Sequence, residues 1–228
     1  MTAKQQESGR AVILYDDALL DHAEPSLFEA PADATSAVGG RGSAWLIRHG
    51  ADEWVLRHYR RGGLPGRVIR DTYIWVGLEA TRAWREWRLT YSLYEEGLPV
   101  PQPVAARVVY SGLLYKADLI TRRIAGATSI AALMAAGGES RTPWGEAGRT
   151  VRRFHDAGVY HADLNAHNLL VDAAGKLYLI DFDRGARRRG RAWKRANLAR
   201  LQRSLRKLAG SAAVMAPAWA AFLDGYGG

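Results

Sequence analysis

The sequence predicts an α+β protein of two lobes, a small β-rich N-terminal lobe with one helix and a reduced, mainly helical C-terminal lobe. Short apolar runs separated by glycine dominate the first half of the chain, as in antiparallel strands. After about residue 122 the apolar positions recur at helical spacing around one short hairpin. We therefore expect a single domain over residues 1–228, with an N-lobe over about 1–121 and a C-lobe over about 122–228.

Strand signals in the N-lobe come in pairs. The runs SAWLIRH (43–49) and EWVLRHY (53–59) flank a Gly-Ala-Asp turn and predict a β-hairpin. A second strand pair is expected at 104–110 and 113–121, with its turn at Ser-Gly. Between the pairs, residues 78–96 have helical character, and the following Gly and Pro end the helix.

The C-lobe shows four helical segments and one hairpin. Helices are expected at 129–136, 143–157, 193–208 and about 212–223. The hairpin is expected from the runs LLVD and KLYLIDF, which the short turn AAG joins.

The charge of the chain is concentrated in one segment. The whole chain of 228 residues carries a net charge of +9, and residues 184–207 hold eleven Lys or Arg and no acid, which leaves −2 for the remainder. This local basicity indicates an anionic surface or ligand.

The chain has no cysteine. The first ten residues have no apolar signal core, and the longest apolar run, 212–223, is too short to span a bilayer. We therefore expect the protein to be located in the cytosol or on the cytosolic side of a membrane.

The segment HADLNAHNLLVDAAGKLYLIDFDRG, at 161–185, gathers the polar residues of most interest. The predicted hairpin places Asn168 and Asp181 at its two open ends. An amide oxygen and a carboxylate, with further positions left for water and phosphate, form a ligand set that Mg²⁺ prefers. Asp163 precedes this hairpin and is placed to contact a substrate hydroxyl. A base, a metal site and an acceptor are what phosphoryl transfer requires. The alternative is that these residues only cap turns and strand ends.

This ordered set, His161-x-Asp163-x₄-Asn168 followed by Asp181-Phe-Asp183, resembles the catalytic and metal-binding segments of the protein kinase-like superfamily. The resemblance implies a kinase-like fold, with ATP and Mg²⁺ as nucleotide and metal. It implies that Asp163 is the catalytic base and that His161 is structural. Asp183 is left with two roles, a ligand of a second metal or a contact to the acceptor.

The N-lobe contains candidates for the nucleotide-binding residues of the same superfamily. The run Gly39-Gly40-Arg41-Gly42 has backbone N–H groups that can bind phosphates, with Gly40 and Gly42 as candidate contacts, although a tight turn explains it equally well. Arg57 stands where kinases carry a phosphate-binding lysine, and Arg keeps the charge with a different shape. The helix glutamate that pairs with it is expected to be Glu86, with Glu79 a less well placed alternative.

The acceptor is expected to be smaller than a protein. Only 47 residues follow Asp181 in the 228-residue chain, too few for the activation segment and further helices that hold a peptide in protein kinases. A small molecule, a sugar or a lipid fits this length, and no protein partner is expected.

The runs LRHYRRGGLPGRV, TRAWREWRL, GLPVPQPVAARV, ADLITRRI and HADLNAHNLLVD resemble the Kdo kinases, which phosphorylate 3-deoxy-D-manno-octulosonic acid (Kdo) in Gram-negative bacteria. The resemblance implies transfer of the ATP γ-phosphate to the 4-hydroxyl of a Kdo residue on a lipid A precursor, at the inner face of the cytoplasmic membrane. It implies Asn168 and Asp181 as metal ligands, with Asp183 as a further candidate. Arg57 then resembles the family's own replacement for lysine.

The basic segment is compatible with such an acceptor. Leu198, Leu201, Leu205 and Leu208 share one face of the expected helix, and Arg200, Arg203, Arg206 and Lys207 lie largely opposite. This pattern is typical of an interfacial helix and equally of a helix whose leucines pack in the core. Attraction of the arginines to an anionic membrane holds in both cases.

Three other functions remain open from the sequence. One is a phosphotransferase for another small molecule, such as an aminoglycoside. Another is a nucleic-acid-binding protein, suggested by the isoelectric point of about 10. The acids Asp163, Asp181 and Asp183 would repel nucleic acid without a metal, so no nucleic acid is expected as a partner. The third is a pseudokinase, suggested by Arg57.

Overall fold

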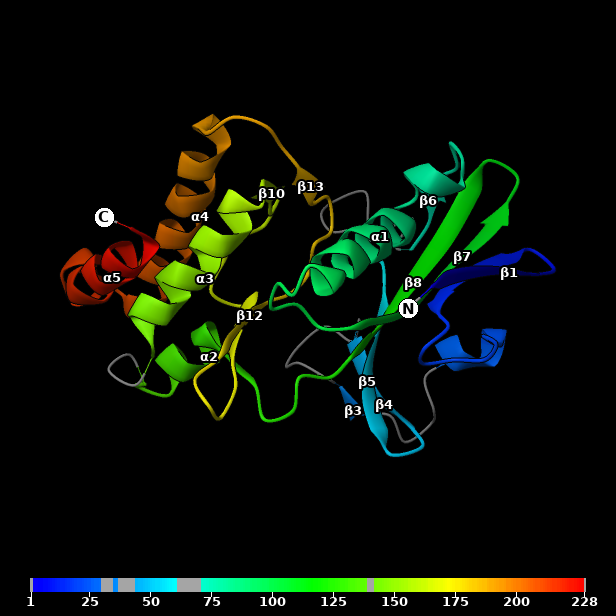
Figure 1. Cartoon of the computed structure of the whole chain (residues 1–228), viewed down its shortest axis with the longest axis horizontal. Helices are drawn as coiled ribbons and strands as arrows, with labels where there is room; N and C mark the ends of the chain where they lie inside the picture. Colours follow the sequence, from blue (N-terminus) through cyan, green and yellow to red (C-terminus); the bar gives the residue numbers. More distant parts are fainter. Residues whose placement is uncertain (1, 30–34, 37–43, 61–70, 139–141, 228) are drawn as a thin grey trace. The chain divides into compact units, whose positions relative to one another are not determined.

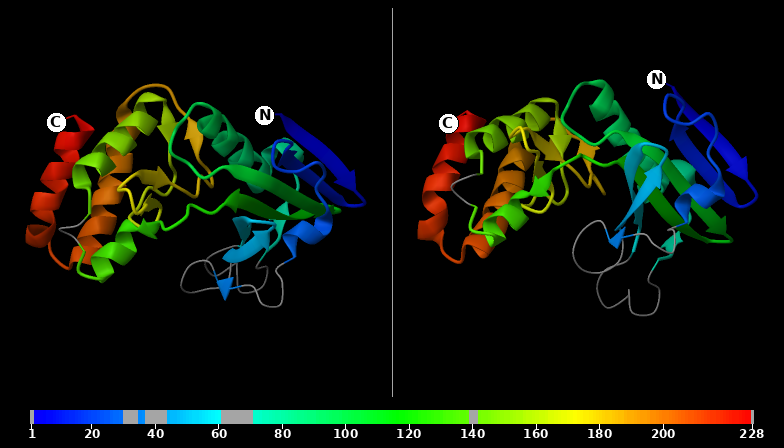
Figure 2. Two further views of the ribbon diagram at one scale, coloured as in Figure 1. Left: turned by 60° about the horizontal axis from the view of Figure 1, so that its bottom comes forward. Right: turned by 90° about the horizontal axis from the view of Figure 1, so that it is seen from below.

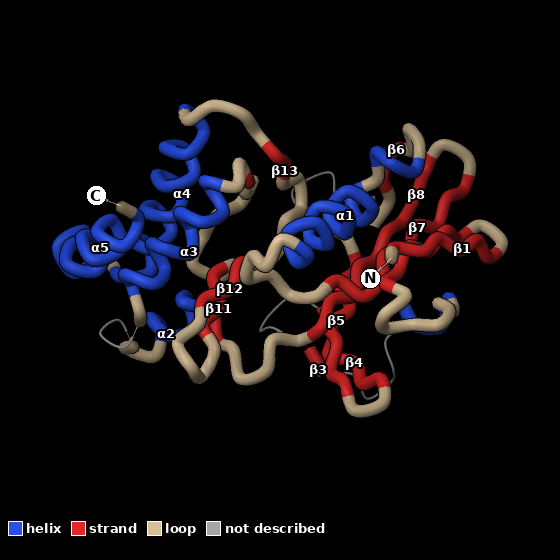
Figure 3. The backbone as a smooth tube through the Cα atoms, in the orientation of Figure 1, coloured by secondary structure: helices blue, strands red, loops and turns tan. Residues whose placement is uncertain are grey.

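A computed structural model describes residues 2–29, 35–36, 44–60, 71–138 and 142–227 of the chain. These residues form two compact units (Figure 1). The first comprises Met1–Tyr91 and Gln102–Arg123, and the second Ser92–Pro101 and Ile124–Gly228. The strands gather in the first unit and most of the helices in the second, as Figure 3 shows. The division into an N-lobe and a C-lobe of one kinase-like domain stays a prediction.

The first unit is built on an antiparallel sheet. Among the described residues its order is β1-β2-β7-β8-β5-β4-β3, and β6 also pairs with β8. The strands are β1 (Ala3–Ser8), β2 (Ala11–Asp16), β3 (Thr35–Ser36), β4 (Ala44–His49), β5 (Asp52–His58), β6 (Tyr73–Ile74), β7 (Pro103–Ser111) and β8 (Leu114–Arg122). The two hairpins predicted from the sequence, β4–β5 and β7–β8, are confirmed by their pairing.

Helix α1 (Arg82–Glu95) covers one face of this sheet (Figure 1). It confirms the helix expected from residue 78, although the first turn, Leu78–Ala80, is a separate 3₁₀ helix. Trp84 and Trp87 of α1 are fully buried among residues of β2, β7 and β8. Burial of two such large side chains fixes α1 on the sheet.

The opposite face of the sheet has its own core. Ile13 and Tyr15 of β2 point into it, whereas Val12 and Leu14 belong to the α1 side. Phe28, from the 3₁₀ helix Pro25–Phe28, closes this second core. Because successive residues of a strand point to opposite faces, a strand buried on both sides requires the continuous apolar run AVILY.

The second unit is mainly helical (Figure 2). Its helices are α2 (Ile130–Ala135), α3 (Trp144–Asp156), α4 (Ala192–Ala209) and α5 (Ala212–Tyr226), which confirms the four helical segments expected from the sequence. Its strands are β9 (Thr128–Ser129), β10 (Val159–Tyr160), β11 (Leu169–Val171), β12 (Leu177–Leu179) and β13 (Ala186–Arg187). The predicted hairpin is confirmed as the pair β11–β12.

Glycines allow α3 and α5 to approach closely. A Cβ atom on Gly148 of α3 would lie 2.0 Å from the carbonyl oxygen of Phe222, and one on Gly225 of α5 would lie 2.0 Å from that of Gly145. Any side chain at Gly148 or Gly225 would therefore separate the helices. This contact packs the C-terminal helix against α3, which leads into the functional segment.

Helix α4 packs its leucines into the second unit. Leu201 and Leu205 are fully buried, and Leu208 is 37% exposed. The sequence left two interpretations of this helix, an interfacial helix or a helix whose leucines pack in the core. Leu201 and Leu205 pack in the core, so these side chains are not available for membrane insertion. Each helix in the described part of the chain is too short or too polar to span a bilayer.

Candidate active site

The segment from His161 to Asn168 joins β10 to β11 and carries the predicted base. The Asp163 side chain is exposed, whereas Leu164, which follows it, and His161, two residues before it, are buried. Its backbone N–H donates to Nδ1 of His161 at 3.1 Å. The carboxylate is therefore presented to solvent by a segment that is anchored in the core.

His161 is held in one neutral tautomer. Its Nδ1 accepts from the Asp163 backbone, and its Nε2–H donates to the carbonyl oxygen of Ile180 at 2.9 Å. Burial lowers the pKa of His161, which favours the uncharged ring that this hydrogen-bond pattern requires. The ring connects the Asp163 loop to the strand end that precedes Asp181, in agreement with the structural role expected from the sequence.

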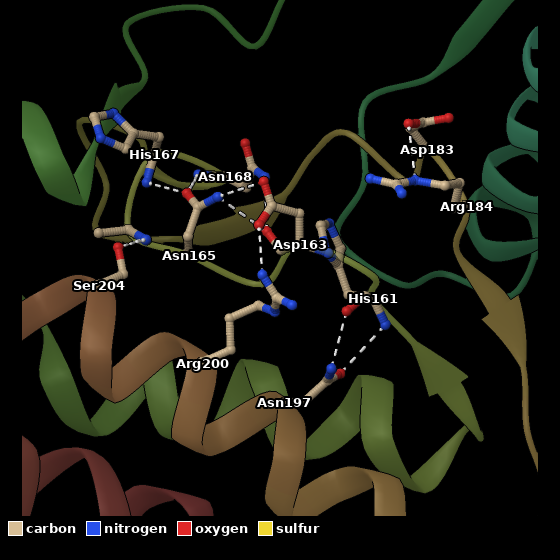
Figure 4. A network of polar contacts seen from close by, with 11 residues as sticks. His161, Asp163, Asn165, His167, Asn168, Asp183, Arg184, Asn197, Arg200 and Ser204 are labelled. Atoms are coloured by element: carbon tan, nitrogen blue, oxygen red, sulfur yellow. Dashed lines mark hydrogen bonds and ion pairs between the residues drawn. The ribbon is translucent and has the colours of Figure 1, made fainter. Parts of the chain in front are cut away.

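A buried amide from α4 fixes the same loop. Nδ2 of Asn197 donates to the backbone carbonyl of His161 at 2.9 Å, and Oδ1 of Asn197 accepts from its N–H at 3.3 Å. Figure 4 shows the Asn197 amide facing the His161 backbone, and Arg200, further along α4, facing Asp163. Nη1 of Arg200 lies 3.3 Å from Oδ1 of Asp163. Helix α4 therefore positions both the loop and the carboxylate.

Two asparagines complete the loop (Figure 4). Nδ2 of Asn165 donates to Oδ2 of Asp163 at 3.0 Å, and its Oδ1 accepts from the backbone of His167 and Asn168. Nδ2 of Asn168 donates to the carbonyl oxygen of Asp163 at 2.9 Å. With its nitrogen used in this way, the Asn168 side chain has its oxygen left to act as a ligand.

The β11–β12 hairpin brings Asn168 next to Asp181. The backbone N–H of Ile180 donates to the carbonyl oxygen of Asn168 at 3.0 Å, and Asp181 follows directly. Asp181 has a φ of +64°, a left-handed conformation that few non-glycine residues adopt. The next residue, Phe182, is buried, with its ring centroid 5.0 Å from that of His161. The anchored ring and the unusual backbone together set the direction of the Asp181 side chain.

Asp183 has a different environment. Oδ2 of Asp183 lies 3.6 Å from Nε of Arg184, and in Figure 4 this pair is drawn apart from the group around Asp163 and Asn168. Within the described residues no three Asp, Glu, His or Cys side chains form a cluster that could hold a metal ion. A ligand set of one amide and one or two carboxylates, as predicted from the sequence, remains compatible with Mg²⁺ chemistry.

The first unit contains the predicted cation and its acid. Nη2 of Arg57, on β5, lies 2.5 Å from Oε2 of Glu86 on α1. The hydroxyl of Tyr59 donates to the same carboxylate oxygen, and Nη2 of Arg57 donates to that hydroxyl at 3.1 Å. Glu86 is buried, and the alternative glutamate, Glu79, instead forms an exposed ion pair with Arg88 at 2.8 Å. The candidate phosphate contacts Gly40 and Gly42 lie outside the described residues.

Comparison with known families explains why these features occur together. The model of the lipopolysaccharide kinase (Kdo/WaaP) family matches residues 27–226. The chain belongs to the lipopolysaccharide kinase (Kdo/WaaP) family. As a lipopolysaccharide kinase it is a phosphotransferase that acts on a hydroxyl group.

Curated relatives support the same assignment. The chain is 46% identical over 221 residues to a 3-deoxy-D-manno-octulosonic acid kinase of Stenotrophomonas maltophilia strain K279a, an alignment that covers 94% of this chain and 88% of the relative. It is 44% identical over 216 residues to a protein of the same name from Xanthomonas campestris pv. campestris strain B100, with coverage of 92% and 86%.

A solved structure supports the fold. It is described as WaaP in complex with acyl carrier protein, with a TM-score of 0.57, 18% identity and coverage of 88% of this chain and 81% of that chain. This similarity confirms the kinase-like α+β fold that the sequence predicts for a lipopolysaccharide kinase. That neighbour has a protein partner, which does not fit the expectation that this chain has none.

Sequence reasoning missed the residues that position the site. Asn197 is 2% exposed and stands on the buried stripe of α4 that Trp193, Leu201 and Leu205 share. A single amide at an apolar position of an amphipathic helix was the available signal, since buried polar groups need partners. Tyr59 and Arg200 gave no such signal, because their partners lie 27 and 37 residues away.

Proposed function

We propose that this lipopolysaccharide kinase transfers the γ-phosphoryl group of ATP to the 4-hydroxyl of a Kdo residue on a lipid A precursor, in inner-core biosynthesis. One observation supports this most directly. The exposed carboxylate of Asp163 lies on a loop that His161 and Asn197 fix, in a chain 46% identical to a protein named as a Kdo kinase. A fixed carboxylate open to solvent is what a hydroxyl acceptor requires.

The proposed reaction assigns one proton transfer to Asp163. Its carboxylate accepts the proton of the Kdo hydroxyl while the hydroxyl oxygen forms a bond to the γ-phosphorus. The bond between that phosphorus and the bridging oxygen of ADP breaks, and ADP leaves with the electron pair. Arg200 and Asn165, which lie 3.3 Å and 3.0 Å from the two carboxylate oxygens, hold the base in place.

The remaining candidates are proposed to bind the nucleotide and its metal. Asn168 and Asp181 are the proposed ligands of Mg²⁺, which, when bound, neutralises charge on the β- and γ-phosphates. Arg57, held by Glu86, is the proposed phosphate contact, together with backbone N–H groups at Gly40 and Gly42. Asp183 stays a candidate for a second metal or for the acceptor.

We also propose that the protein acts as a peripheral protein at the cytoplasmic face of the inner membrane, where such an acceptor would be met. The exposed arginines of α4, Arg203 and Arg206 among them, supply positive charge near an anionic surface. This attraction needs no insertion, which agrees with the burial of Leu201 and Leu205.

The function is tested by incubating the protein with ATP, Mg²⁺ and a Kdo-bearing lipid A precursor, followed by mass spectrometry of the lipid. One added phosphate on the Kdo residue, located at O4 by NMR, is expected. The precursor without Kdo is the matched control acceptor and should gain nothing. Phosphate transfer to an aminoglycoside only, or transfer to lipid without Kdo, would contradict the proposal.

A further inference from the structure

An arginine-lined pocket opens beside Asp163. Its volume is about 400 Å³, and its lining residues are Tyr160, Ala162, Asp163, Arg184, Arg188 and Arg200. All of them belong to the second unit. The volume is within the range of small-molecule sites, and the lining carries three guanidinium groups against one carboxylate. The pocket therefore combines the proposed base with an excess of positive charge.

The backbone fixes the arrangement of the pocket. Strand β10, which ends at Tyr160, pairs with β13, and the Arg188 backbone N–H donates to the carbonyl oxygen of Gly158 at 2.8 Å. This pairing places the guanidinium carbon of Arg188 3.5 Å from the centroid of the Tyr160 ring. A guanidinium stacked on an aromatic face keeps its edge N–H groups available for an anion.

The three arginines differ in their acid partners. Arg200 lies 3.3 Å from an Asp163 oxygen, and Arg184 lies 3.6 Å from an Asp183 oxygen. Within the described part of the chain, Arg188 has a cation–π contact and a backbone hydrogen bond but no carboxylate partner. Arg188 is therefore the arginine of this pocket whose charge is left for a ligand.

We propose that this pocket binds the sugar acid of the acceptor and that Arg188 binds its carboxylate. The inference rests on the proposed function and deepens it. Kdo carries its carboxylate and its 4-hydroxyl on one pyranose ring, so a cation and a base in one pocket can contact the two groups of one sugar. An anionic sugar is repelled by Asp163 alone, and the arginines offset that repulsion. The planar guanidinium matches a carboxylate in a bidentate pair.

Phosphates are the other anions that this pocket can attract, from lipid A or from ATP. The test therefore compares Arg188→Gln with wild type. The KM is measured for a water-soluble, deacylated acceptor and for two modified forms of it, one with its carboxylate as a methyl ester and one without its lipid A phosphates. The KM for ATP is measured as well. Arg189→Gln is the matched control, because Arg189 is the exposed neighbour of Arg188 and does not line the pocket. The soluble acceptor removes any effect of membrane attraction.

We expect Arg188→Gln to raise the acceptor KM about ten- to a hundredfold, the effect of one charged hydrogen-bonded pair, with the ATP KM within about twofold of wild type. Wild type should discriminate against the methyl ester by a similar factor, and Arg188→Gln should lose that discrimination. Removal of the lipid A phosphates should leave the effect of Arg188→Gln unchanged. Equal behaviour of Arg188→Gln and Arg189→Gln, or a rise in the ATP KM instead, would overturn the inference.

A binding measurement separates this inference from the proposed function. Titration calorimetry of a Kdo glycoside into the wild-type protein and into Arg188→Gln needs no turnover. Binding that depends on Arg188 while no phosphate is transferred would contradict only the proposed function. Transfer by wild type with no dependence of binding or KM on Arg188 would contradict only the pocket assignment.

Discussion

The side-chain amide of Asn197 satisfies both backbone groups of His161, with Nδ2 2.9 Å from the carbonyl oxygen and Oδ1 3.3 Å from the backbone nitrogen. These two hydrogen bonds join α4 to the loop that carries Asp163, across 36 residues of sequence. Both residues are buried, so neither backbone group of His161 has water as a ready substitute. The geometry of the base thus depends on a helix that follows it in the chain.

Replacing Asn197 by Leu should therefore reduce stability and activity together. Leu has the same number and branching of side-chain heavy atoms but leaves the His161 carbonyl and N–H buried without this partner, at a cost of about 1–3 kcal/mol for each lost partner. Urea unfolding should show this loss, and kcat should fall because Asp163 is no longer held. Arg195→Ala, at an exposed position of the same helix, should change the free energy of unfolding by no more than about 0.5 kcal/mol. Unchanged kcat in Asn197→Leu would contradict the positioning role.

Asp163→Asn should remove the proton acceptor while leaving the fold intact. We expect kcat to fall at least about a hundredfold, the lower end for loss of a general base. Because Asp163 is not a proposed ligand of the nucleotide, calorimetric ATP binding should be close to that of wild type. The exposed Asp224→Asn is the control and should keep full activity. Retained turnover in Asp163→Asn would exclude it as the base.

Glu86 and Glu79 of the first unit provide a matched comparison for the Arg57 site. Glu86 is buried and pairs with Arg57, whereas Glu79 forms an exposed pair with Arg88. Glu86→Gln should raise the ATP KM and lower the free energy of unfolding by about 1–3 kcal/mol. Glu79→Gln should change the unfolding free energy by at most about 1 kcal/mol, as for other surface pairs, and leave kinetics unchanged. Equal effects of the two substitutions on the ATP KM would contradict the assignment of Glu86.

Removal of divalent metal should abolish phosphate transfer, and added Mg²⁺ should restore it. Asp181→Asn and Asn168→Ala should each raise the Mg²⁺ concentration needed for half-maximal activity, because each removes one proposed oxygen ligand. Asp183→Asn distinguishes the two roles left for that residue. A rise in the Mg²⁺ requirement indicates a second metal ligand, and a rise in the acceptor KM alone indicates an acceptor contact. Activity that survives EDTA would contradict the metal site.

His155 should make stability fall as the solution is acidified. Burial lowers the pKa of His155 from 6.5 to about 4, and its Nδ1 lies 2.7 Å from the Tyr226 hydroxyl. Between these values the unfolded chain binds a proton that the folded chain does not, so the stabilisation present above pH 6.5 is lost as the pH falls toward 4. From pH 7 to pH 5 this residue should account for about 2 kcal/mol of lost unfolding free energy.

His155→Asn provides the check on that pH dependence. Asn keeps a polar atom near Tyr226 but does not titrate, so the pH dependence of urea unfolding should become shallower. The lowered pKa of His161 contributes in the same direction, and it remains in the variant. The difference between the wild-type and variant curves therefore isolates His155. Parallel curves would contradict the effect of its burial.

Much of the fold could be predicted because it follows from local patterns. The hairpins β4–β5 and β7–β8 come from alternating apolar runs around glycine turns, and the helices come from apolar positions at helical spacing. The spacing of Asp163, Asn168 and Asp181 around one short hairpin could also be read from the sequence, because the three residues lie within 19 residues of each other.

The sequence by itself thus determined the element types, the order of the polar residues and the local segment that carries them. Only the tertiary structure decided what surrounds the base. Asn197 and Arg200 reach the Asp163 loop because α4 folds back on it, and Arg188 stacks on Tyr160 because β13 pairs with β10. Such contacts depend on how distant segments pack, and no periodicity within one segment encodes the partner that it meets.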